Sequence, residues 1–140
     1  EYFSDIDLTS SETDIDQLES LLDTFIPMAD GMRDLVQGLD DFIVATTSLE
    51  NSQYSDAEDR YEAAQSHFTT AESTFTDLES SAPNSIQSSI IEMTCYAGAL
   101  ADGAERYAAG SGYYADGDTQ AGDDEFEMGE DDLNRCSFEA

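Results

Sequence analysis

Two cysteines, Cys95 and Cys136, offer the most predictable chemistry in this chain. Both lie in stretches with helical spacing, on either side of a turn at residues 115–118. Cys95 lies 20 residues before the start of this turn and Cys136 lies 18 residues after its end, so two facing helices would bring the thiols to nearly the same height. A disulfide requires a Cα separation of about 4.4–6.8 Å, which equal heights allow. We predict a Cys95–Cys136 disulfide, with two buried free thiols as the alternative.

Histidine chemistry is limited to one residue, His67. A catalytic triad or a zinc site needs further histidines or thiols. The Glu-x-x-His pairs of di-iron bundles do not occur, and neither does a glycine-rich phosphate loop. His67 lies beside Phe68, at the border of the apolar face of the second predicted helix, so we interpret it as a structural imidazole. We predict no catalytic residues and therefore no enzyme.

Carboxylates are too numerous to identify a metal site by themselves, but one segment has a suggestive spacing. Asp116, Asp118 and Glu127 stand at the first, third and twelfth places of a stretch that resembles an EF-hand calcium loop. Gln120 and Ala121 depart from that pattern at its fifth and sixth places. The three acidic residues are the candidate metal ligands, although we expect loosely associated Na⁺, K⁺ or Ca²⁺ rather than a dedicated metal or any other cofactor.

Four large side chains form the candidate ligand pocket. Tyr61, Met93, Tyr96 and Tyr107 fall on the apolar faces of two predicted helices. Apolar walls with a few polar groups are typical of small-molecule sites between helices. A pocket there would make the chain a ligand-binding domain.

The balance of charge is the strongest feature of the whole composition. The chain of 140 residues carries 33 acidic and four basic residues, all four of them arginine, for a net charge of −29. In molar salt the Debye length falls to about 3 Å, so neighbouring carboxylates repel one another only weakly. In this respect the composition resembles that of proteins from extremely halophilic archaea, which implies a salt-rich environment and no particular function.

The same composition bears on partners and location. Without a basic patch we expect no nucleic-acid partner, and no stretch approaches the ~20 apolar residues of a membrane span. A protein partner or self-association fits better. The chain begins at Glu1, from which we expect either the removal of a signal peptide or membrane anchor, or simple trimming. With the disulfide, this favours an extracytoplasmic, secreted or cell-surface location over the cytoplasm of a salt-accumulating cell.

Apolar residues spaced three and four apart predict an all-α fold, an antiparallel up-and-down bundle of four long helices. We expect an N-terminal arm over residues 1–13 and a single domain over 14–140, with helices near 14–51, 55–80, 84–114 and 118–137. Pro27 lies inside the first helix and should kink or split it. A first helix much longer than the last must either overhang the bundle or fold back over its end.

The first and second helices have the clearest apolar faces. The residues expected to form the core face of the first helix are Leu18, Leu21, Phe25, Met28, Met32, Leu35, Leu39, Phe42, Thr46 and Leu49. The second helix alternates large and mostly alanine layers: Tyr54, Tyr61, Phe68 and Phe75, each followed three positions later by Ala57, Ala64, Ala71 and Leu78. From these features we predict a non-catalytic binding or structural module of a halophile, in a cell-surface assembly, with a small-ligand or metal-ion-binding domain as the alternative.

Overall fold

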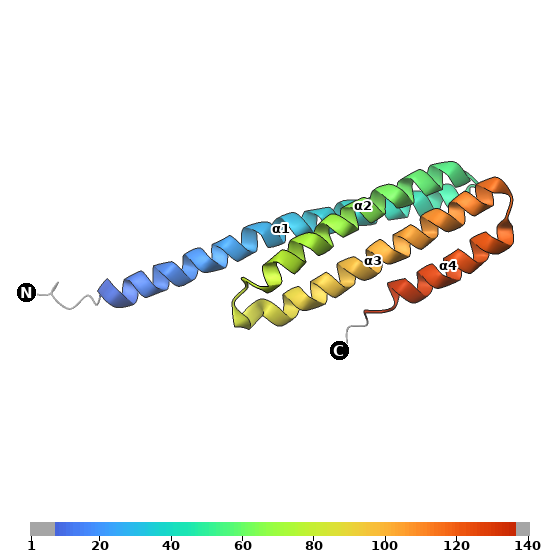
Figure 1. The fold of residues 1–140 in the computed structure, drawn as a ribbon. Coiled ribbons are helices and arrows are strands. Elements are labelled where there is room, and N and C mark those ends of the chain that lie inside the picture. The colour runs from blue at the N-terminus through green and yellow to red at the C-terminus, as the bar shows by residue number, and fades with distance from the viewer. Residues whose placement is uncertain (1–7, 137–140) are drawn as a thin grey trace, which may run out of the picture.

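Each run of apolar residues with helical spacing forms one helix in the computed structural model, which describes residues 8–136 (Figure 1). The helices are α1 (Leu8–Glu50), α2 (Tyr54–Glu79), α3 (Asn84–Asp116) and α4 (Thr119–Leu133). No strand occurs within these described residues. The predicted all-α, up-and-down bundle is confirmed.

The helices pack in the order in which they occur along the chain. Backbone contacts join α1 to α2, α2 to α3 and α3 to α4, and α3 makes a minor contact with α1. Within residues 8–136, α1 and α4 do not approach each other, although a closed bundle would bring them together. The bundle is therefore open on one side, and α1 has one principal neighbour.

The ends of α2 and α3 lie within two residues of the prediction, whereas two other boundaries differ more. α1 begins at Leu8, so residues 8–13 are helical where we expected an arm; residues 1–7 of that arm lie outside the described residues. Neither glycine nor proline occurs between Leu8 and Ile26, so nothing in the sequence stops the helix from extending backwards. α4 ends at Leu133, four residues earlier than expected, where the side-chain amide of Asn134 donates to the Glu130 carbonyl at 2.8 Å.

α1 continues through Pro27 as one uninterrupted helix, so a split there is wrong. A proline costs one backbone hydrogen bond, but contacts on both sides of it, from Thr24 to Gly31, keep the same face turned toward the bundle. The kink stays a prediction. Figure 1 shows that the first turns of α1 extend past the α2–α3 turn, so the long helix overhangs rather than folding back.

The contact between α1 and α2 depends on two glycines. A Cβ atom added at Gly38 would lie 2.5 Å from the Phe68 ring, and one added at Gly31 would lie 2.8 Å from the Phe75 ring. Both phenylalanines are completely buried, as is Tyr61. The predicted alternation of large and small layers in α2 is confirmed, and its large layers are seated on small residues of α1.

The core face of α1 differs from the predicted one by a rotation of the helix. The buried residues of this helix from Glu12 onward are Thr24, Gly31, Leu35, Gly38 and Ala45. Leu18, Phe25, Met32 and Leu39, which we expected in the core, are 37–58% exposed. The prediction was wrong there because small and polar residues occupy the positions closest to α2, where a large side chain would not fit.

The turn between α3 and α4 has the expected geometry. Gly117 adopts the left-handed conformation with φ of 87° and ends α3. The Asp118 carboxylate accepts a hydrogen bond from the Ala121 backbone N–H at 3.1 Å and caps α4. This turn brings α4 back along α3, with the Phe126 ring over Gly110 and the Leu133 side chain over Gly103.

Candidate functional site

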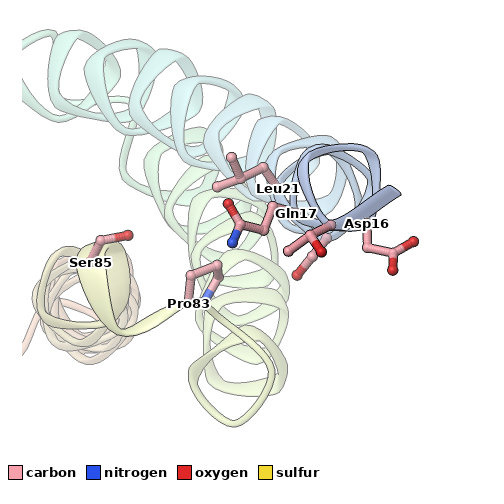
Figure 2. Close-up of a pocket in the computed structure, with 7 residues that line it drawn as sticks. Asp16, Gln17, Leu21, Pro83 and Ser85 are labelled. Carbon is pink, nitrogen blue, oxygen red and sulfur yellow. The ribbon is translucent and has the colours of Figure 1, made fainter. Parts of the chain in front are cut away.

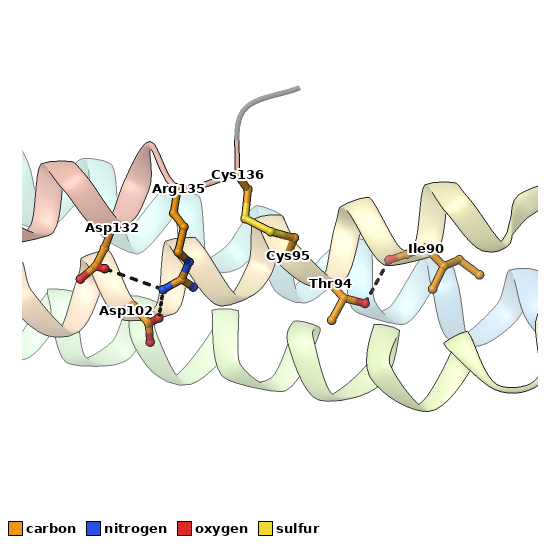
Figure 3. The surroundings of a disulfide bond; sticks show 7 residues. All are labelled: Ile90, Thr94, Cys95, Asp102, Asp132, Arg135 and Cys136. Atoms are coloured by element: carbon orange, nitrogen blue, oxygen red, sulfur yellow. Dashed lines mark hydrogen bonds and ion pairs between the residues drawn. A yellow bond between two sulfur atoms is a disulfide. The ribbon is translucent and has the colours of Figure 1, made fainter. Parts of the chain in front are cut away.

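A disulfide joins Cys95 of α3 to Cys136, just beyond the end of α4 (Figure 3). Their Cα atoms lie 6.0 Å apart, as the equal heights of the two residues predicted. Arg135, next to the bond, donates to the Asp102 carboxylate of α3 at 2.7 Å and lies 3.7 Å from Asp132. The covalent bond and the ion pair together fasten the last turn of α4 to the middle of α3.

The four residues of the candidate ligand pocket separate into two clusters. Tyr61 and Tyr107 pack against each other with ring centroids 5.3 Å apart, and Phe42 lies 4.9 and 5.4 Å from the two rings. Met93 and Tyr96 pack instead against the other core cluster, around Phe68 and Phe75. Aromatic rings from α1, α2 and α3 thus fill the space beside Tyr61 in which a ligand was predicted.

The two tyrosines of the aromatic cluster are held in their neutral form. Burial raises the pKa of Tyr61 more than its 3.0 Å hydrogen bond with Thr46 lowers it, and Tyr107 and Glu50 raise it slightly further. Burial also raises the pKa of Tyr107, with Glu130 adding to the effect. Neither phenol is therefore prepared to act as a base, and the cluster has the character of a core.

His67 lies between two aspartates of α1. Its Nδ1 is 4.0 Å from Asp34 and its Nε2 is 3.7 Å from Asp41, and the side chain is about one-third exposed. Asp41 also accepts a hydrogen bond from Arg60 at 3.0 Å. The imidazole thus belongs to a polar contact between α1 and α2, as a structural role requires.

The three candidate metal ligands have separate surroundings. The Asp118 carboxylate is used as the cap of α4, Asp116 ends α3, and Glu127 lies exposed within α4. Among the described residues, no group of three or more histidine, cysteine, aspartate or glutamate side chains is arranged to hold a metal ion. An EF-hand would need a loop over these positions, but residues 119–127 form the first part of α4.

The open grooves on the described surface include four of about 300 to 480 Å³, and none of these four is lined by a residue of the candidate pocket. The largest of the four lies between the N-terminal half of α1 and the α2–α3 turn. Figure 2 shows Gln17 and Leu21 of α1 on one side of it and Pro83 and Ser85 on the other, while the Asp16 carboxylate points away. Polar and apolar side chains line it together, and Asp16 is the only titratable residue among them.

The most unusual surface is an apolar stripe along α1, which we call the outer stripe. Its residues repeat in alternating steps of three and four: Ile15, Leu18, Leu22, Phe25, Ala29, Met32, Val36, Leu39 and Ile43. All are exposed, the eight large ones by 37–63%. Of the thirteen large hydrophobic residues exposed in the described chain, ten lie on α1: these eight, and Ile26 and Val44 beside them.

The outer stripe was missed as a surface because half of it was taken for core. Val36 follows the buried Gly31 by five residues, which is about 140° around the helix. The stripe therefore faces away from α2. A comparison of two heptad series, one offset from the other by a single residue, could have separated this face from the one that contacts α2.

The arginines of the chain are all engaged with carboxylates. Each has an acidic partner within 3.2 Å: Arg33 with Asp30, Arg60 with Asp41, Arg106 with Glu125, and Arg135 with Asp102. Two of these pairs meet at a third carboxylate, because Arg106 and Arg135 each lie 3.7 Å from Asp132. None of the described helices combines the length and apolarity required to cross a bilayer.

Comparisons of the chain with protein-family models, curated proteins and solved structures found no match.

Proposed function

We propose that this chain is a non-catalytic binding or structural module that works in high salt outside the cytoplasm, as one component of a cell-surface assembly. The observation that carries the proposal is the outer stripe of α1. Large apolar side chains that are about half exposed along a helix raise the free energy of the protein in water unless another surface covers them. A purpose in binding explains why selection would keep them in a chain that is otherwise so acidic.

Charge and redox chemistry support the proposed environment. A net charge of −29 on 140 residues is tolerated best where salt screens it. The Cys95–Cys136 bond is consistent with an oxidising compartment. Each of the four arginines is paired with a carboxylate, which supports a protein partner over nucleic acid.

A small-ligand function remains the second candidate, and the groove of Figure 2 is the feature that favours it. This groove is open to solvent, whereas most ligand sites are enclosed and bury most of the ligand's surface. The outer stripe is far larger, so protein binding is the better supported of the two functions.

The test is retention of the protein, with its disulfide intact, on cell-envelope material from the cells that encode it, in molar NaCl. Val36→Glu places a charge in the outer stripe, and Gln37→Glu adds the same charge one residue away on an exposed position outside it. We expect the wild type and Gln37→Glu to be retained saturably and Val36→Glu to be lost. Equal retention of all three proteins would contradict the proposal.

A further inference from the structure

The geometry points to a second copy of this chain as the occupant of the outer stripe, with the two α1 helices pairing in parallel along it. This inference rests on the proposed function, because it names the partner of the same surface. Three properties of α1 carry it: the period of the stripe, its area and the placement of charge around it.

The period is that of a two-stranded coiled coil. Steps of three and four over nine successive positions keep one seam facing a partner helix from Ile15 to Ile43 when the two helices supercoil around each other. Ile15, Val36 and Ile43 fall at the positions where parallel dimers favour β-branched residues, and Leu18 and Leu39 fall at those where they favour leucine. Such a seam is complementary to itself, so a second copy satisfies it without a special partner sequence.

The area is sufficient for a stable pair. The eight large side chains of the outer stripe, each about half exposed, leave roughly 800 Å² of mostly apolar surface. The largest apolar patch on a typical monomer is about 300–600 Å². A standard protein interface buries about 800 Å² on each partner, so pairing along α1 reaches the size of a specific interface.

Charge is kept out of the contact even though the chain is highly acidic. No member of the outer stripe is charged, and Asp16, Asp23 and Asp30 each follow a stripe residue by one position, about 100° around the helix. The acidic residues that border the stripe are Asp14, Glu19 and Asp40. In a parallel pair Glu19 faces the partner's Asp14, whereas Asp40 faces the side of the partner's Leu35, so carboxylates meet across the seam only in its first heptad.

The open architecture leaves room for this partner. α1 contacts α2 with the face that contains Gly31 and Gly38, and α4 does not approach it within the described residues. The two bundles of a pair would therefore lie on opposite sides of the joined α1 helices. Repulsion between two chains of −29 opposes pairing in dilute buffer, so we expect dimers in molar salt.

The test is sedimentation equilibrium of the disulfide-bonded protein in molar NaCl over a range of concentrations. We expect the wild type and Gln37→Glu to have twice the chain mass. Val36→Glu, which buries an unpaired charge from each copy in the seam, should weaken pairing at least about 100-fold. Circular dichroism verifies that both variants keep their helices. A wild type that stays monomeric, or a dimer that Val36→Glu leaves unchanged, would overturn the inference.

Orientation is tested by mild oxidation of Val36→Cys, with Gln37→Cys as the matched control. Parallel helices bring the two thiols introduced by Val36→Cys together, so we expect a covalent dimer from the first variant alone. Failure to cross-link within a dimer would overturn the parallel arrangement.

The envelope experiment separates the two proposals. If the wild type is monomeric while Val36→Glu still loses envelope binding, self-pairing is wrong and the proposed function stands; if Val36→Glu changes neither property, both are wrong.

Discussion

At the scale of single residues, the Cys95–Cys136 bond is expected to contribute most to stability. It closes a separation of 41 residues, for which the loop-entropy model gives about 4 kcal/mol as an upper figure. We expect the Cys95→Ser, Cys136→Ser double variant to lose up to that much free energy of unfolding, measured by urea denaturation in molar NaCl. Because α4 is short and follows the turn at Gly117, hydrogen exchange in α4 should accelerate more than in α2.

The ion pair beside this bond provides the control. Arg135 and Asp102 are both about half exposed, so their attraction is screened by solvent and by salt. Arg135→Gln should therefore change the free energy of unfolding by less than about 1 kcal/mol. A loss as large as that of the double cysteine variant would mean that the ion pair, and not the disulfide, fastens α4.

The buried phenols of Tyr61 and Tyr107 should lower the stability of the fold at alkaline pH. Burial raises both pKa values above the ordinary value of 10.0, so the folded state favours the neutral phenols. Their contribution is complete below pH 10 and is lost as the pH rises from 10 through the raised values. We expect the free energy of unfolding to fall over that range, and Tyr61→Phe to reduce the fall; a fall of the same size in the variant would assign it to other groups.

Residue chemistry was predictable from the sequence where spacing alone determines it. The pairing of Cys95 with Cys136 follows from their distances to one turn, and the cap at Asp118 follows from the glycine before it. The candidate pocket depended on which rings meet in space. Phe42 of α1 fills the position beside Tyr61, and nothing in the local sequence of either helix reveals that contact.

At the scale of helices, glycines determine how closely α1 approaches α2. An alanine at Gly38 would place its Cβ 2.5 Å from the buried Phe68 ring, so the helices must separate or the ring must move. We expect Gly38→Ala to cost about 1–3 kcal/mol of unfolding free energy, as overpacked cores do, despite the better helix propensity of alanine.

Gly112→Ala in α3 is the matched control for this substitution. Its added Cβ would lie 2.8 Å from an oxygen of Glu58, the free end of a flexible side chain that can rotate away. Helix propensity then dominates, and we expect no loss or a gain of up to about 1 kcal/mol. Thermal or urea unfolding of the two variants measures the difference, and equal destabilisation would show that helix separation is not limited by the Phe68 contact.

Helix positions were also predicted better than helix orientation. The 3–4 spacing located all four helices, because periodicity records which stretches have an apolar face. α1 contains two series of residues with helical spacing, offset by one residue. One series has large apolar side chains and the other has mostly small ones, and the core was assigned to the series with the larger side chains. The true contact face contains Thr24, Gly31, Gly38 and Ala45, which a hydrophobicity pattern scores poorly.

At the scale of the whole molecule, self-repulsion between carboxylates should make stability depend on salt. We expect the free energy of unfolding at neutral pH to rise from dilute buffer to molar NaCl as the Debye length contracts. The pKa of Glu58 supports the premise, since burial raises it first and the neighbouring Glu62, Asp59 and Asp116 raise it further.

Acidification provides an independent check on this explanation. A carboxyl whose folded pKa is raised favours folding while it is protonated, and that contribution is lost as the pH rises from the ordinary value of 4.5 through the raised one. In dilute buffer the difference between stability at low and neutral pH should be larger than in molar salt. Stability that is the same in dilute and concentrated salt would exclude screening as the condition for this surface.

The sequential packing of the helices has a consequence for how the chain folds. Because α1 does not return to α4, the main tertiary contacts join helices that are neighbours in the sequence, and chain closure between distant segments is not required. Helical proteins with such local contacts fold in microseconds to milliseconds. Each hairpin of adjacent helices is a natural starting point, and the disulfide joins the two helices of the last one. A protein assembled in this order buries its core faces early, which shortens the time in which those faces can aggregate.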